Sequence, residues 1–161
     1  MARSTVGSGE NVNPVVVYAV ETALQIAITE LNENLREIYV EAYTQPTLAE
    51  YIYQRTSTEL AVLFGHFNPD WSESDFYEAE IGSAGMMRAY MARPCDKYFT
   101  LRKKIERFLQ MSLDMYHVPH ETQQSIFAKL SGIDLVNMAN SVMKKLFAML
   151  EMTFEFKFEN A

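Results

Sequence analysis

The stretch EIGSAGMMRAYMARP, residues Glu80–Pro94, organises the rest of the chain. Its first half contains Gly82, Ser83, Ala84 and Gly85, which have almost no side chain and are followed at once by Met86 and Met87. Small residues on a helix allow another backbone or a flat ligand to come close, and methionine offers soft apolar surface beside the gap. We therefore expect this stretch to hold a cofactor, a small ligand or a neighbouring helix.

The length and composition indicate one globular domain. A chain of 161 residues with 48% hydrophobic and 22% charged residues suits a single core. Glu21 and Glu30 interrupt the most apolar stretch, so we expect no membrane span. The first dozen residues lack a signal-peptide apolar region, and Cys95 is the only cysteine. We expect a cytoplasmic protein with a flexible N-terminal tail over residues 1–12.

The charge is divided unevenly along the chain. Residues 1–80 carry three basic and thirteen acidic side chains, whereas residues 81–161 carry eleven basic and eight acidic ones. The single basic cluster, Arg102 to Arg107, contains Glu106 and is typical of a solvated helix face. We expect no nucleic-acid partner.

Helical spacing begins near the N-terminus and predicts an all-α fold. Asn13-Pro14 is a good helix entry, because asparagine caps and proline suits the first helical position. Apolar residues then recur every three or four positions, which predicts a helix to about Tyr43 with a bend near Asn32 and Asn34. The helical domain should span residues 13–152.

Cap signals divide the middle of the chain. Thr47 and Glu50 fit a capping box that opens a second helix, and Ser72 with Asp75 fits a cap for the helix containing the stretch quoted above. That helix should end before Pro94, because the residue preceding proline is disfavoured in the helical region.

The last third of the chain should hold two further helices and a tail. Asp96 is expected to cap the first, and the segment 116–119 should end it. The last helix should run from near Glu121 to about Met152, which makes it a core or dimer element. Residues 153–161 alternate apolar and polar, which indicates a strand-like tail unless the helix continues through it.

Motifs for catalysis or metal binding are weak. His117, His120 and Glu121 are close in sequence, but Pro119 between the histidines argues against one helical metal face. The chain has no nucleophile motif and no glycine-rich phosphate loop. Cys95 follows Pro94 and is expected to be simply packed. We expect no metal site and no enzymatic activity.

Two stretches resemble the globin-like sensor domains of bacteria, the globin-coupled-sensor and protoglobin group, which includes haem-free members in stressosome sensor proteins. The first comprises Ile81-Gly82, Pro94 and Tyr98-Phe99, and the second is the run Lys129–Leu135, KLSGIDL. The resemblance implies a single globin-like domain of about five to seven helices. It also implies a pocket at the candidate residues Ile81, Gly82, Gly85, Met86, Met87, Tyr98 and Phe99.

The chain departs from this group at the haem-ligating histidine. The matching position is Gly85 when counted from Ile81, and Met87 or Arg88 when counted back from Pro94. None of these is a histidine, so the resemblance implies a fold that has lost haem. Cys95 lacks the motif of bilin-carrying relatives. We expect no cofactor.

The sequence and the resemblance leave three possible functions. The first is a haem-free sensory or regulatory module that binds a small apolar ligand or a protein partner, forms a homodimer through its first and last helices, and passes its signal to a partner carrying the output. The second is a structural or interaction protein, for example a phage or host-interaction factor, that acts through helix contacts and its C-terminal tail. The third is a haem or bilin protein. The interaction candidates are Ile133, Val136, Phe154, Phe156 and Phe158.

Overall fold

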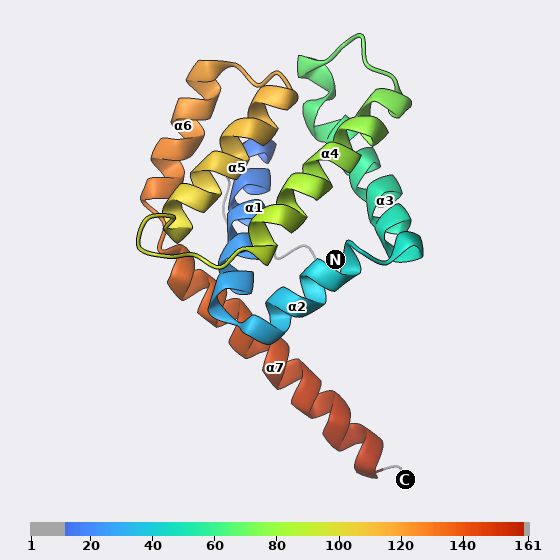
Figure 1. Cartoon of the computed structure of the whole chain (residues 1–161), viewed down its shortest axis with the longest axis vertical. Helices are drawn as coiled ribbons and strands as arrows, with labels where there is room; N and C mark the ends of the chain where they lie inside the picture. Colours follow the sequence, from blue (N-terminus) through green and yellow to red (C-terminus); the bar gives the residue numbers. More distant parts are fainter. Residues whose placement is uncertain (1–11, 160–161) are drawn as a thin grey trace.

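The chain folds into seven α-helices and one short 3-10 helix in a computed structural model that describes residues 12–159, with side chains through Met149 (Figure 1). The elements are α1 (Pro14–Leu31), α2 (Glu33–Ala42), α3 (Pro46–Phe64), η1 (Gly65–Phe67), α4 (Glu73–Ala92), α5 (Leu101–Met115), α6 (His120–Ser131) and α7 (Leu135–Glu159). No strand occurs within residues 12–159. The expected all-α fold of five to seven helices is confirmed.

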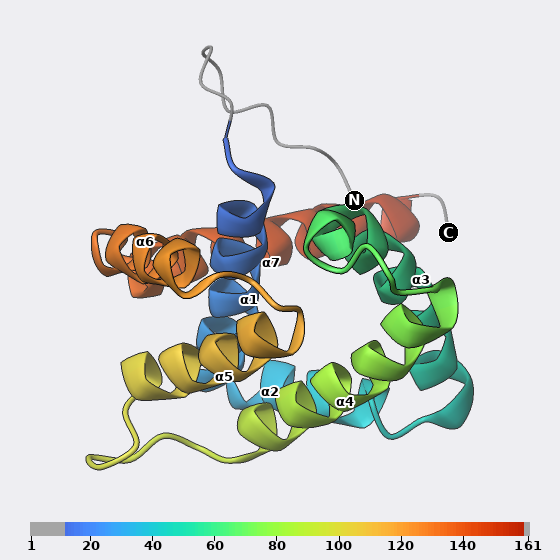
Figure 2. The ribbon, with the colours of Figure 1, turned by 90° about the horizontal axis from the view of Figure 1, so that it is seen from above.

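The helix α1 is the centre of the molecule. It contacts all six other α-helices and stands between α5 and α6 on one side and α3 and α4 on the other (Figure 2). The Asn13 side chain accepts a hydrogen bond from the backbone N–H of Val15, and Pro14 occupies the first turn, as expected. Among the described helices, α1 alone is long and apolar enough to cross a membrane by length and composition. Of this stretch, 39% is buried inside the protein.

A stack of aromatic rings fills the core beside α1. The Tyr116 ring lies parallel to the Phe64 ring at 4.6 Å between centroids and nearly parallel to Phe76 at 6.5 Å. Tyr18 of α1 meets the edge of this stack, with its ring 5.1 Å from Phe64. Such contacts stabilise a core beyond the area that they bury. They join α1, α3, α4 and the end of α5.

The expected bend near Asn32 is a complete break between two helices. The Asn32 backbone is extended, its N–H donates to the carbonyl of Ile28 at the end of α1, and its side chain accepts from the N–H of Leu35 in α2. One asparagine therefore caps both helices. Its short polar side chain competes for backbone groups, which is why the helix divides here.

The cap predictions for α3 and α4 have different outcomes. α3 begins at Pro46, before Thr47, and its N-cap Gln45 makes no side-chain cap bond, so the expected Thr47–Glu50 capping box is wrong. Proline at the first turn sets the start instead. The Ser72–Asp75 capping box is present, and α4 ends at Ala92, before Pro94, as expected.

The start of α5 lies later than expected. The carboxylate of Asp96 accepts hydrogen bonds from the backbone N–H groups of Tyr98 and Phe99, at 2.8 and 2.7 Å. These bonds close a turn, so Asp96 does not cap the helix. Thr100 is the N-cap, and its hydroxyl accepts from the N–H of Lys103. An aspartate forms such local turns as readily as helix caps.

The expected single last helix is two helices. α6 ends at Ser131 with Gly132 as its C-cap, and the Asp134 carboxylate accepts from the N–H of Asn137 in the first turn of α7. α7 then continues to Glu159, so the segment 153–159 is helical and the strand-like tail is not formed. A strand needs a partner strand for its backbone groups, whereas a helix satisfies them internally.

Candidate functional site

The helix α7 projects away from the body of the molecule (Figure 1). Its first turns pack on α1, where Ala139 and Met143 of α7 meet Ala27 and Ile28. Met143 is the last buried residue among the described side chains, and those from Lys144 to Met149 are all exposed. Leu146 and Phe147 nevertheless are apolar, with 40% and 45% of their surface exposed. An apolar face thus continues past the point where the body ends.

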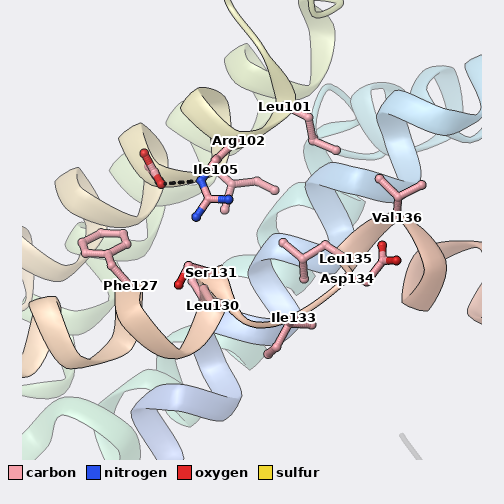
Figure 3. A pocket seen from close by; sticks show the side chains of 11 residues that line it. Leu101, Arg102, Ile105, Phe127, Leu130, Ser131, Ile133, Asp134, Leu135 and Val136 are labelled. Carbon is pink, nitrogen blue, oxygen red and sulfur yellow. Dashed lines mark hydrogen bonds and ion pairs between the residues drawn. The ribbon is translucent and has the colours of Figure 1, made fainter.

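A groove of about 300 Å³ lies where α5, α6 and the start of α7 meet (Figure 3). Its apolar wall comprises Leu101, Ile105, Phe127, Leu130, Ile133, Leu135 and Val136. Arg102 and Glu106 form an ion pair of 3.1 Å at its polar edge. The sharp connection at Gly132 positions Ile133 in the groove, next to the first turn of α7.

The structure brings two of the predicted interaction residues together. Ile133 and Val136 both line this groove, and Val136 is 43% exposed. The backbone positions of Phe154, Phe156 and Phe158 fall on the projecting part of α7. Their side chains lie outside the described residues, so their role in an interface stays a prediction.

The predicted pocket residues of α4 lie on opposite faces of the helix. Ile81, Gly82 and Gly85 are exposed. A Cβ atom added to Gly82 or Gly85 would meet no atom within 4 Å outside the glycine's own helical surroundings. The two glycines therefore face open space, and no helix of the described residues crosses there. Met87 is buried on the other face.

The remaining predicted pocket residues lie elsewhere. Tyr98 is 73% exposed in the loop before α5, with the Lys97 ammonium 4.8 Å from its ring centre. Phe99 packs against Tyr90 at 6.0 Å between ring centroids. Met86 is half-buried at the edge of the core. The structure does not gather the seven predicted residues into one pocket.

A different cavity lies on the buried face of α4, and we name it the Glu80 cavity. It has a volume of about 100 Å³. Its walls come from the four helices α1, α3, α4 and α5 and from the end of α2, and its residues are Tyr18, Thr22, Gln25, Tyr43, Thr56, Leu60, Glu80, Ser83, Ala84, Met87 and Phe108. Six of these carry a hydroxyl or an amide, and one carries a carboxyl.

Glu80 is the most unusual group in this cavity. It is only 5% exposed, and within the described chain its carboxyl makes no hydrogen bond or ion pair. Burial raises its pKa to about 8, because water is not available to stabilise the charged form. The Tyr18 hydroxyl in the same cavity shares a hydrogen bond of 2.5 Å with Ser112.

The tyrosines around Glu80 stay neutral. Burial raises the pKa of Tyr18 and of Tyr43 to about 12, and the nearby Glu80 carboxylate adds to both shifts. Burial and the Glu80 charge also raise the pKa of Tyr116, whose hydroxyl has no hydrogen-bond partner among the described residues. Glu80 is thus the group in this cluster that titrates near neutral pH.

The histidines have structural surroundings. His117 shares a hydrogen bond of 2.5 Å with the side chain of Asn68, His66 packs on Phe67, and His120 is within 3.1 Å of Gln124. No group of three histidine, cysteine, aspartate or glutamate side chains within the described residues could hold a metal ion.

Sequence reasoning missed Glu80, although a signal for it exists. Phe76, Glu80, Ser83, Met87 and Met91 recur at intervals of three and four and are all buried. A glutamate in register with this apolar series predicts a carboxyl on the buried face of α4. The prediction of a pocket relied instead on the glycines between these positions, which lie on the exposed face of α4.

None of the family models, curated proteins or solved structures compared with this chain matches it.

Proposed function

We propose that this chain is a non-enzymatic regulatory module of globin-like type, without haem, that assembles as a homodimer through α7. The observation that carries the proposal is the exposed apolar surface of Leu146 and Phe147, which follow the buried Met143 on α7. A helix that served only the core would end, or become polar, where the body ends. An apolar face on a projecting helix is typical of an interaction site.

The sequence of α7 favours a second copy as the occupant of this face. Val142, Leu146 and Met149 are exposed apolar residues of α7 at successive intervals of four and three. This is the spacing of helices that pair along a shared apolar seam. Such a seam is self-complementary under two-fold symmetry, so the same face serves both subunits.

The size of the interface indicates that the groove takes part. A stable dimer buries about 800 Å² per partner. With 25 residues, α7 is about 37 Å long and about 10 Å wide, so its outer face supplies roughly half of that area. The groove at Ile133 and Val136 lies at the start of the same helix and would supply part of the rest.

The proposed absence of catalysis, the location and the partner rest on the sequence. The chain lacks a nucleophile motif and a phosphate loop, which supports a regulatory or interaction role over catalysis. The protein acts in the cytoplasm, and a protein partner carries the output of the dimer. The competing function is that of a structural protein, which would assemble through the same face of α7 but would bind no ligand.

Light scattering coupled to size-exclusion chromatography tests the dimer. The full chain should elute as a dimer, and the variant with both Leu146→Glu and Phe147→Glu should elute as a monomer with an unchanged helical circular dichroism spectrum. The charged side chains would have to be buried without partners in the dimer, whereas they are solvated in the monomer.

Val62→Glu is the matched control. Val62 is an exposed apolar residue of α3, 85% exposed and on another element of the fold, so this variant should remain a dimer. A wild-type chain that stays monomeric at its highest soluble concentration would contradict the proposal. Dissociation by Val62→Glu would place the interface on α3 instead.

A further inference from the structure

The Glu80 cavity has features of a binding site that the dimer does not explain. Glu80 comes from α4, Tyr18 and Thr22 from α1, and Thr56 from α3, so the cavity lies inside the helical body. Gln25, Tyr43 and Thr56 are partly exposed and form its open side. A small molecule can therefore enter without unfolding a helix.

The charged groups in the walls of the Glu80 cavity favour a cation over an anion as ligand. Its walls contain one carboxyl and, within the described residues, no lysine, arginine or histidine. An anion would meet no positive partner there and would be repelled by Glu80. A cation would gain an ion pair, hydroxyl and amide oxygens as hydrogen-bond acceptors, and the aromatic faces of tyrosine and phenylalanine.

We propose that the Glu80 cavity binds a small organic ammonium cation, with the Glu80 carboxylate as its counter-ion and the Tyr18, Thr22 and Tyr43 hydroxyls as acceptors. An apolar cavity of about 150 Å³ holds benzene, so the present 100 Å³ suits a ligand of about three or four non-hydrogen atoms. Ethylammonium is a probe of this size. A ligand of three or four non-hydrogen atoms binds no tighter than roughly 40 μM to 0.5 mM.

Binding should release a proton. Burial raises the pKa of Glu80 to about 8, so the carboxyl is mostly protonated at neutral pH in the free protein. An ammonium ion stabilises the carboxylate, and the carboxyl proton leaves to the solvent. The groups that face Glu80 are Tyr18 from α1, Tyr43 from the end of α2 and Tyr116 from the end of α5, and all three remain neutral in this pH range.

The test is a titration of the full chain with ethylammonium chloride, followed by backbone amide NMR at about pH 6.5 and about pH 8.5. Amides of α4 and α1 around the cavity should shift in a saturable way, with affinity roughly tenfold or more higher at the upper pH. Potassium chloride at equal ionic strength, and ethanol as a neutral analogue, should not produce these shifts.

Glu80→Gln keeps the size of the side chain and removes its charge, and it should abolish the binding. Glu78→Gln is the matched control, because Glu78 is exposed on the same helix, and it should bind as the wild type does. Equal binding by Glu80→Gln, equal binding of ethanol, or no saturable shift at up to roughly 100 mM would overturn the proposal and leave the cavity as a site for water.

A second measurement needs no variant. Calorimetry of ethylammonium binding at neutral pH, in two buffers with different heats of ionisation, reports the protons released, and close to one proton per ligand is expected. Binding without proton release would overturn the assignment of Glu80 as counter-ion. Dimer formation is measured separately, so the two proposals can fail independently.

Discussion

The Lys104 ammonium lies 3.1 Å from the Glu30 carboxylate and is almost completely buried, with 1% of its side chain exposed. Glu30 also pairs with Arg36 at 3.1 Å and accepts the backbone N–H of Cys95 at 2.7 Å. Lys104 further donates to the carbonyl of Arg93. This one carboxylate therefore connects α1, α2, α5 and the loop that follows α4.

Lys104→Met should destabilise the fold by about 3 to 5 kcal/mol, because it leaves part of a buried ion network without its partner. Urea denaturation measures the change. Lys103→Met is the control, since Lys103 is exposed and should change the free energy of unfolding by less than about 0.5 kcal/mol. Adding Glu30→Gln to Lys104→Met should recover part of the loss. An equal effect of the two lysine substitutions would contradict this account.

Alanine at Gly82 or Gly85 should stabilise the protein by about 0.5 to 1 kcal/mol each, because glycine inside a helix costs backbone entropy. Neither added Cβ would meet another atom within 4 Å. Thermal unfolding monitored by circular dichroism measures the effect. A loss of stability or of dimer mass would instead indicate that a second chain packs against these glycines.

Tyr116→Phe should leave the stability unchanged or raise it slightly, because the buried hydroxyl of Tyr116 has no hydrogen-bond partner within the described part of the chain. The ring stack with Phe64 and Phe76 is retained. Tyr18→Phe removes the 2.5 Å bond to Ser112 and should cost about 1 kcal/mol. Urea denaturation of both variants checks the contrast, and a larger loss for Tyr116→Phe would show that its hydroxyl is satisfied.

The stability of the fold should fall between about pH 4.5 and about pH 8 because of Glu80. Its pKa rises from the ordinary 4.5 to about 8 on folding, so the folded state binds more protons over this range and loses stability as the pH rises. The full effect is about 3 to 5 kcal/mol. Denaturation across this range should show the slope in the wild type and in Glu78→Gln, and its absence in Glu80→Gln. The same slope in all three would exclude Glu80 as its source.

Local signals explain which parts of the fold were predictable. Asn13-Pro14, the Ser72–Asp75 box and the stop before Pro94 act through neighbouring backbone groups, so sequence spacing was sufficient for them. The break at Gly132 was missed because a single glycine within a helical pattern can also be tolerated. Asp96 was misplaced because an aspartate closes turns as well as capping helices.

The candidate sites depend on contacts that spacing does not encode. The helical register places Glu80 on the buried face of α4, but only the fold shows that no described cation reaches it. The apolar pattern of α7 predicts a long helix, but its projection depends on where α1 and the rest of the body end. The sequence places Gly82 and Gly85 at a gap on the surface of α4. The larger buried residues of α4, however, determine which side of this helix faces the core.

The central position of α1 has a mechanical consequence. One side of this helix supplies Tyr18, Thr22 and Gln25 to the wall of the Glu80 cavity, and another side supplies Ala27 and Ile28 as the seat of α7. Leu35 and Tyr39 of α2 and Leu101 of α5 also pack against the seat of α7, but α1 makes the extensive contact with α7. If the proposed guest in the cavity rotated or shifted α1, the angle at which α7 leaves the body would change, and the length of α7 would magnify that change at its far end.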